Sequence, residues 1–294
     1  MKRLIAGLVQ QSCTADRNAN VEKSAAGIRE AVSRGAELVL LQELHLGPYF
    51  CQTEDPANFD LAEPIPGPSC ELFSVLAREL GAVIVTSVFE RRAPGLYHNT
   101  AVVLDKDGSI AGKYRKMHIP DDPGYYEKYY FTPGDLGFRP VETSLGRLGV
   151  LICWDQWYPE AARLMALSGA EMLVYPTSIG WNSGEAETER KLMLDAWTTI
   201  QRSHAIANGL PVICANRVGF EPASERTRRG IIFWGNSFII GPQGEFFAKA
   251  GHHTDEVLTA EIDIERTQAV RHNWPFLRDR RVDAYQDLLM VYRD

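Results

Sequence analysis

The stretch LGVLICWDQWYPEAARLMALSGAEMLVYP, residues 148–176, decides the fold class of this chain. It opens with a short apolar run that ends at Cys153 and closes with a second one, EMLVYP, that ends at Pro176. The segment between them carries apolar residues at helical spacing from Pro159 onward. A strand, a helix and a strand in succession are typical of a layered α/β fold whose strands are covered by helices.

The same alternation extends over the rest of the chain. Further apolar runs occur at residues 4–11, 37–43, 81–90, 100–105, 211–218 and 236–242, and helical spacing occurs at 21–34, 69–80 and 192–208. The turn signals DKDG and GPQG predict hairpins, so we expect mixed sheets. Because no linker or low-complexity tract divides the chain, we expect a single domain over residues 1–294.

The composition is that of a globular protein. Of 294 residues, 45% are hydrophobic and 23% are charged, and the formal net charge is −7. This balance argues against a nucleic-acid partner, and no apolar run approaches the roughly 20 residues that a membrane span requires. Five scattered cysteines indicate neither a disulfide framework nor a zinc ribbon. We therefore expect a cytoplasmic protein with no nucleic-acid and no membrane partner.

Three reactive side chains follow apolar runs. ELVLLQE ends in Glu43, LGVLIC ends in Cys153, and Lys116 comes just after a third expected strand. In open α/β sheets, ligands bind beyond the carboxyl ends of the strands, so these side chains can meet in one crevice.

The three groups are chemically complementary. A thiolate is a nucleophile, but a free cysteine with a pKa near ~8.5 is mostly protonated at neutral pH. A carboxylate can take the thiol proton, and an ammonium can stabilise the oxyanion that forms when a carbonyl is attacked. Buried acids and lysines at strand ends also form purely structural ion pairs, so the residues alone leave both interpretations open.

The sequence motifs around these three residues favour catalysis. LQELHLGPYF (41–50), YRKMHIPDDPGYYEKYYFTPGD (114–135) and GVLICWDQWYPEAARLMALSGAEMLVYPT (149–177) together resemble the three signature regions of the nitrilase, or carbon–nitrogen hydrolase, superfamily. The similarity is greatest to its N-carbamoylputrescine amidohydrolase branch. It extends from the first expected strand to RDRR at 278–281.

This resemblance implies a four-layer αββα sandwich that hydrolyses a non-peptide C–N bond without a metal or an organic cofactor. By motif position, Glu43 would be the general base, Lys116 the oxyanion-stabilising cation and Cys153 the nucleophile. Glu127 matches a second glutamate that positions the substrate and the lysine, and the backbone N–H of Trp154 would complete the oxyanion hole. Family members also assemble as homo-oligomers, here through PEAARLMALSG and a C-terminal tail from about residue 265.

The other end of a carbamoyl amine substrate carries an ammonium, which needs a carboxylate or aromatic partner once it is desolvated. The candidate substrate-binding residues are Tyr49, Asp121, Asp122, Tyr125, Trp154, Asp155, Ser178, Trp181, Asn182 and Glu187. Close family members read approximately AIGSEP after YPT, whereas this chain reads SIGWNSGEAETERK. That departure lies where the substrate tail is expected, so it leaves the identity of the amine open.

Two alternatives follow from the same residues. The substrate can be another N-carbamoyl amine, an N-carbamoyl amino acid or a small aliphatic amide; an arginine such as Arg202 or Arg217 at the far end of the pocket would favour a carboxylate. A nitrilase-like protein that binds a ligand without turnover is the alternative from a different functional class.

Overall fold

The computed structural model of the protein describes residues 3–224 and 229–293. A first six-stranded sheet has the order β15-β1-β2-β3-β4-β5. Its strands are β1 (Arg3–Gln10), β2 (Leu38–Leu41), β3 (Val83–Ala93), β4 (Leu96–Leu104), β5 (Ile110–Arg115) and β15 (Glu256–Asp263). The central strands β1, β2 and β3 run parallel, while β15, β4 and β5 are added antiparallel, so the sheet is mixed.

A second six-stranded sheet has the order β14-β13-β10-β8-β7-β6. Its strands are β6 (Val141–Thr143), β7 (Gly146–Val150), β8 (Met172–Pro176), β10 (Val212–Ala215), β13 (Phe238–Ile240) and β14 (Phe246–Lys249). Here too the central strands β7, β8 and β10 are parallel and the outer pairings antiparallel. A small third sheet contains β11 (Val218–Pro222), β12 (Gly230–Trp234) and β9 (Gly180–Asn182).

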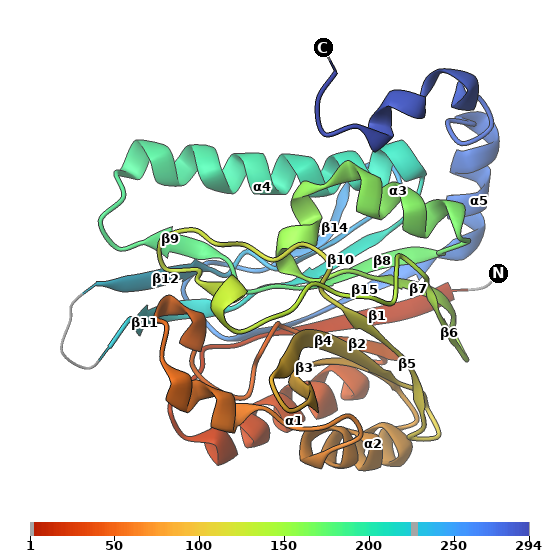
Figure 1. Ribbon diagram of the computed structural model, residues 1–294. Helices are drawn as coiled ribbons and strands as arrows, with labels where there is room; N and C mark the ends of the chain where they lie inside the picture. The colour runs from red at the N-terminus through yellow and green to blue at the C-terminus, as the bar shows by residue number, and fades with distance from the viewer. Residues whose placement is uncertain (1–2, 225–228, 294) are drawn as a thin grey trace.

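The two large sheets pack face to face, with one helical layer outside each (Figure 1). Helices α1 (Arg17–Ser33) and α2 (Pro68–Leu80) cover the first sheet, and α3 (Pro159–Leu167) and α4 (Glu187–Asn208) cover the second. The largest apolar cluster lies between the sheets and continues under α3 and α4, and a second one lies under α1 and α2. The predicted αββα sandwich with mixed sheets is therefore confirmed.

The predicted run at residues 148–153 is strand only as far as Val150. Its last residue, Cys153, begins the short helix η4 (Cys153–Trp157) instead. The run at 211–218 is divided between β10 and β11. The hairpins predicted at DKDG and GPQG are β4–β5 and β13–β14. Strand β15 was not expected from sequence, because it lies at a sheet edge and is only partly buried, so its residues lack a continuous apolar pattern.

After α5 (Ile264–Asn273) the chain continues over the ends of α3 and α4, with the short helices η5 (Val282–Ala284) and η6 (Gln286–Leu289) (Figure 1). The side chains of Leu289, Val291 and Tyr292 are almost fully exposed there. Among the described residues, no helix is both long enough and apolar enough to cross a membrane.

Candidate active site

Cys153 lies on a sharp turn between β7 and η4. Its φ is +41°, in the left-handed region that non-glycine residues rarely occupy. Two residues earlier, the backbone N–H of Leu151 still donates to the carbonyl of Val174 in the second sheet (3.0 Å), so the turn begins abruptly at the end of the strand. Strained backbone of this kind concentrates at functional sites, and a strand-to-helix elbow presents a nucleophile above the sheet.

Asp155 fastens this turn. One carboxylate oxygen accepts hydrogen bonds from the Ile152 N–H (2.9 Å) and the Tyr114 hydroxyl (2.8 Å). The other accepts from the His118 backbone N–H (3.0 Å) and contacts His118 Nδ1 (2.7 Å). Asp155 is fully buried and does not line the cavity, contrary to the expectation from sequence, because both of its oxygens are used to join the Cys153 turn to the segment that carries Lys116.

Lys116 lies between two carboxylates at the point where the strand ends of the two sheets meet. Its Nζ is 2.9 Å from Glu43 Oε1 and 2.6 Å from Glu127 Oε2, and all three side chains are buried. Glu43 reaches this point because its backbone N–H donates to the carbonyl of Thr177 (3.4 Å), just beyond β8. The structure thus brings together the four residues expected from sequence to form the reactive centre.

The charges of this centre are set by burial and by the neighbouring groups. Burial raises the pKa of the Cys153 thiol well above its usual value, Glu43 adds to this effect and Lys116 opposes it. Burial lowers the pKa of Lys116, but the carboxylates of Glu127 and Glu43 outweigh burial and hold it above its usual value. Burial raises the pKa of Glu127 to about 7, against the influence of Lys116. The resting thiol is therefore protonated and needs a base.

Asn99 orients the carboxylate of Glu43. Its Nδ2 donates to Glu43 Oε1 (2.6 Å), the oxygen that also meets Lys116. The other oxygen, Oε2, is buried and has no hydrogen-bond partner among the described residues. Glu43 therefore keeps one free acceptor for a proton. Sequence reasoning missed Asn99, although a fully buried amide within the apolar strand β4 is a signal that could have found it.

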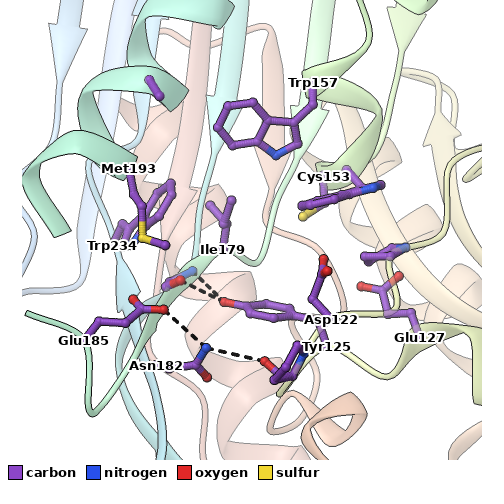
Figure 2. Close-up of a pocket in the computed structure, with 15 residues that line it drawn as sticks. Asp122, Tyr125, Glu127, Cys153, Trp157, Ile179, Asn182, Glu185, Met193 and Trp234 are labelled. Atoms are coloured by element: carbon purple, nitrogen blue, oxygen red, sulfur yellow. Dashed lines mark hydrogen bonds between the residues drawn. The ribbon is translucent and has the colours of Figure 1, made fainter. Parts of the chain in front are cut away.

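Cys153 opens into a cavity of about 500 Å³ (Figure 2). Of the predicted substrate-binding residues, Asp122, Tyr125, Trp154 and Asn182 line it. Tyr125 is fixed by its hydroxyl, which donates to the carbonyl of Gly180 and accepts from the N–H of the same residue (2.9 Å each). Asn182 lies across the cavity from Cys153 in Figure 2.

The other predicted substrate-binding residues do not line the cavity. Tyr49 is buried behind it and donates its hydroxyl hydrogen to Glu127 Oε1 (2.6 Å). Ser178 is buried as well, with its Oγ donating to the Glu43 carbonyl (2.9 Å). The indole N–H of Trp181 turns away to the Arg190 carbonyl (3.0 Å). Asp121 is exposed on the surface.

Glu185 occupies the place that the sequence analysis gave to Glu187. Glu187 begins α4, is largely exposed and pairs with Lys191, whereas Glu185 lines the cavity and contacts Asn182 Nδ2 (3.3 Å). An apolar wall that includes part of α4 was also missed; its residues are Trp157, Ile179, Met193, Ala196 and Trp234 (Figure 2). Only Met193 and Ala196 share an element, so no local pattern in the sequence unites the whole wall.

Comparison with known proteins agrees with this geometry. Residues 5–272 match the family model for carbon–nitrogen hydrolases. The chain is 45% identical to an N-carbamoylputrescine amidase of Solanum lycopersicum, over 96% of this chain and 94% of the relative, and 40% identical to a citrullinase of Francisella tularensis, over 99% and 100%. The crystal structure of a carbon–nitrogen hydrolase from Helicobacter pylori superposes with a TM-score of 0.96 at 54% identity, covering 99% of this chain and all of the other. The chain therefore belongs to the carbon–nitrogen hydrolase family.

Proposed function

We propose that this enzyme hydrolyses N-carbamoylputrescine to putrescine, carbon dioxide and ammonia. The observation that carries the proposal is the cavity itself, because Cys153 opens into it beside Glu127, which binds Lys116, while Glu185 lies at the other end (Figure 2). The first end suits a carbamoyl group and the second a distal ammonium. The similarity to the Solanum lycopersicum amidase supports the same substrate.

The first half-reaction forms a covalent intermediate. Glu43 takes the thiol proton through its free Oε2, and the Cys153 sulfur attacks the carbamoyl carbon. Two of the three N–H bonds of Lys116 point to carboxylates, so the third can meet the oxyanion together with the Trp154 backbone N–H. Glu43 then gives its proton to the leaving nitrogen. Putrescine departs and a carbamoyl thioester remains on Cys153.

The second half-reaction consumes one water molecule. Glu43 takes a proton from water, and the resulting hydroxide equivalent attacks the thioester carbon. The C–S bond breaks and the Cys153 thiol is restored by the proton that Glu43 holds. The released carbamic acid decomposes to carbon dioxide and ammonia, so one water is used for each molecule cleaved.

The charge at the far end favours a diamine over an amino acid. The residues that line the cavity in the described part of the chain include Asp122 and Glu185 but no lysine, arginine or histidine. Arg202 donates to the Gly244 carbonyl (2.8 Å), Arg217 is buried, and neither lines the cavity. Citrulline and N-carbamoyl amino acids carry a carboxylate, which would find no cationic partner there.

The proposal includes a homo-oligomer in a reducing compartment such as the cytoplasm. Apolar side chains are exposed on α3 and on the tail after α5, notably Leu164, Leu167, Leu289, Val291 and Tyr292. Exposed apolar surface can mark protein contacts, and residues of α3 and of the tail line one surface pocket together. All five cysteines are free, which suits a reducing environment.

The test is release of ammonia from four substrates: N-carbamoylputrescine, citrulline, N-carbamoyl-β-alanine and glutaramide. We expect turnover of the first alone and its loss in Cys153→Ala. Cys70→Ala, which removes a buried thiol of α2, is the control and should keep the activity. Turnover of citrulline instead would overturn the substrate assignment but keep the mechanism, and turnover of none would favour a binding protein.

A further inference from the structure

The reaction as proposed does not use the buried ion pair between Arg217 and Glu221. Arg217 follows β10, Glu221 lies in β11, and Nη1 of the arginine is 2.6 Å from Oε1 of the glutamate. Arg217 is fully buried and Glu221 is 4% exposed, yet neither lines the cavity. Burying two charges is costly, and a buried pair is weak evidence for stability alone. The other contacts of Arg217 and Glu221 indicate the role of this ion pair.

Arg217 holds the backbone that carries the proposed base. Its Nη2 donates to the carbonyl of Glu43 (3.2 Å) and to that of Leu44 (2.8 Å), and its Nη1 donates to that of Gly47 (2.9 Å). Leu44 has a φ of +48°, a conformation that persists only where surrounding contacts enforce it. One guanidinium thus fixes the turn in which the chain leaves β2 and presents Glu43.

Glu221 connects the same pair to the second carboxylate of the centre. Its Oε2 accepts the backbone N–H of Tyr49 (2.6 Å), and the Tyr49 hydroxyl donates to Glu127 Oε1 (2.6 Å). Glu127 Oε2 meets Lys116, and Lys116 meets Glu43. Since Arg217 binds the carbonyl of Glu43, the contacts close into a ring of six residues, named here the buried ring: Arg217, Glu221, Tyr49, Glu127, Lys116 and Glu43.

We propose that Arg217, Glu221 and Tyr49 are positioning residues of the reaction, which hold the two carboxylates on opposite sides of Lys116. Arg217 fixes Glu43 through its backbone, and Glu221 fixes Glu127 through Tyr49. This keeps Glu43 Oε2 free for the Cys153 proton and keeps one N–H of Lys116 free for the oxyanion. The inference rests on the proposed roles of Glu43, Lys116 and Cys153, and it adds residues that touch neither the cavity nor the substrate.

The cleanest test is Tyr49→Phe, which removes only the hydroxyl that meets Glu127. We expect kcat to fall roughly 10-fold with KM changed less than about twofold, because a hydrogen bond to a charged group is lost and no substrate contact is. The matched control is Tyr175→Phe, since Tyr175 is equally buried but its hydroxyl has no partner among residues 3–224 and 229–293. That variant should keep the wild-type kcat.

Two readouts separate positioning from simple loss of structure. The Tyr49 hydroxyl favours the charged form of Glu127, so its removal should shift the acidic limb of the pH profile of kcat upward by about one pH unit. Labelling of Cys153 by iodoacetamide should slow several-fold, which reports on the thiol without any substrate. Wild-type kcat, pH profile and labelling rate in Tyr49→Phe would overturn the proposal.

Glu221→Gln is the second variant and probes the other side of the buried ring. A glutamine offers one oxygen to the two donors, Tyr49 N–H and Arg217, so one link is broken while the size is kept. We expect Glu221→Gln to remain folded, as checked by circular dichroism, and to show the same fall in kcat and the same slower labelling as Tyr49→Phe. If the wild type turns over none of the four substrates, the proposed function fails, whereas equal labelling rates in wild type and both variants refute the positioning role itself.

Discussion

The two ends of the cavity are built in different ways. At the Cys153 end, the buried Glu43 and Lys116 lie just beyond strands β2 and β5 of the first sheet, and Cys153 lies beyond β7 of the second. At the other end, Asn182 and Glu185 lie beside the loop that contains Asp122. Within the described part of the chain, the Asn182 side chain makes only long hydrogen bonds, 3.3 Å to Glu185 and 3.4 Å to the Pro123 carbonyl. Chemistry requires fixed geometry, whereas recognition of a flexible diamine does not. Substitutions at the first end should change kcat, and those at the second end KM.

The largest effect is expected for Glu43→Gln. The amide keeps the shape of the side chain but cannot take the thiol proton, so kcat/KM should fall roughly 10²–10⁴-fold, the usual contribution of general acid–base catalysis. The measurement is ammonia release under substrate saturation and under limiting substrate. Glu63→Gln changes a carboxylate that caps the start of α2 and pairs with Arg17 away from the cavity; it is the control and should stay near wild type. A loss confined to KM would contradict the division between the two ends.

A second prediction concerns stability and pH. The folded pKa of Glu127 is raised to about 7 from a usual 4.5, mainly by burial. The native state therefore binds more protons than the unfolded state between these values, and this part of the unfolding free energy is present below about pH 4.5 and lost as the pH rises through 7. The shift corresponds to roughly 3 kcal/mol.

The check is urea unfolding of wild type and Glu127→Gln at several pH values between 4.5 and 7.5. The difference between the two unfolding free energies should change in favour of the variant as the pH rises, because glutamine does not titrate. A difference that is constant over this range would show that Glu127 keeps an ordinary pKa in the folded protein.

Sequence reasoning succeeded where local pattern and chemistry coincide. Glu43 and Cys153 each follow an apolar strand, so their positions at the strand ends could be predicted before the structure was known. The αββα layers were expected from family resemblance, and the alternation of strands and helices agrees with them. An amide in the apolar strand β4 marks Asn99 as unusual, but the roles of Asn99 and Arg217 could not be predicted, because they depend on hydrogen bonds to a residue 56 and 174 positions away in the sequence.

The substrate end was the least predictable part. An acidic run such as GEAETER offers several carboxylates, and only the place where α4 begins decides which of them turns inward. Asp155 was assigned to the substrate-binding residues for a related reason, because an acid next to the nucleophile suggests substrate contact. In the structure its carboxylate instead accepts from four backbone and side-chain donors. Proximity in sequence could not distinguish these two uses of a carboxylate.

A third prediction tests the rigidity of the Cys153 end through Asp155→Asn. The amide would direct its NH₂ at donors that Asp155 now accepts, which leaves at least one buried N–H or O–H unsatisfied. The unfolding free energy should fall by about 2 kcal/mol, read from urea unfolding. Asp121→Asn is the control: Asp121 is exposed, so this substitution should change the unfolding free energy by less than about 0.5 kcal/mol. Equal stability of the two variants would mean that Asp155 does not fasten the turn.

The smallest effect is expected at the far end of the cavity, where Glu185→Gln removes a charge beside Asn182. KM for N-carbamoylputrescine should rise about fivefold with kcat unchanged, because a partly exposed carboxylate contributes only about 1 kcal/mol to binding an ammonium. Glu187→Gln, two residues on but exposed and paired with Lys191, is the matched control and should leave KM unchanged. The neutral substrate glutaramide distinguishes charge from shape, since its KM should not respond to either variant. If Glu185→Gln lowers kcat instead, the far end contributes to the chemistry and the two ends of the cavity are coupled.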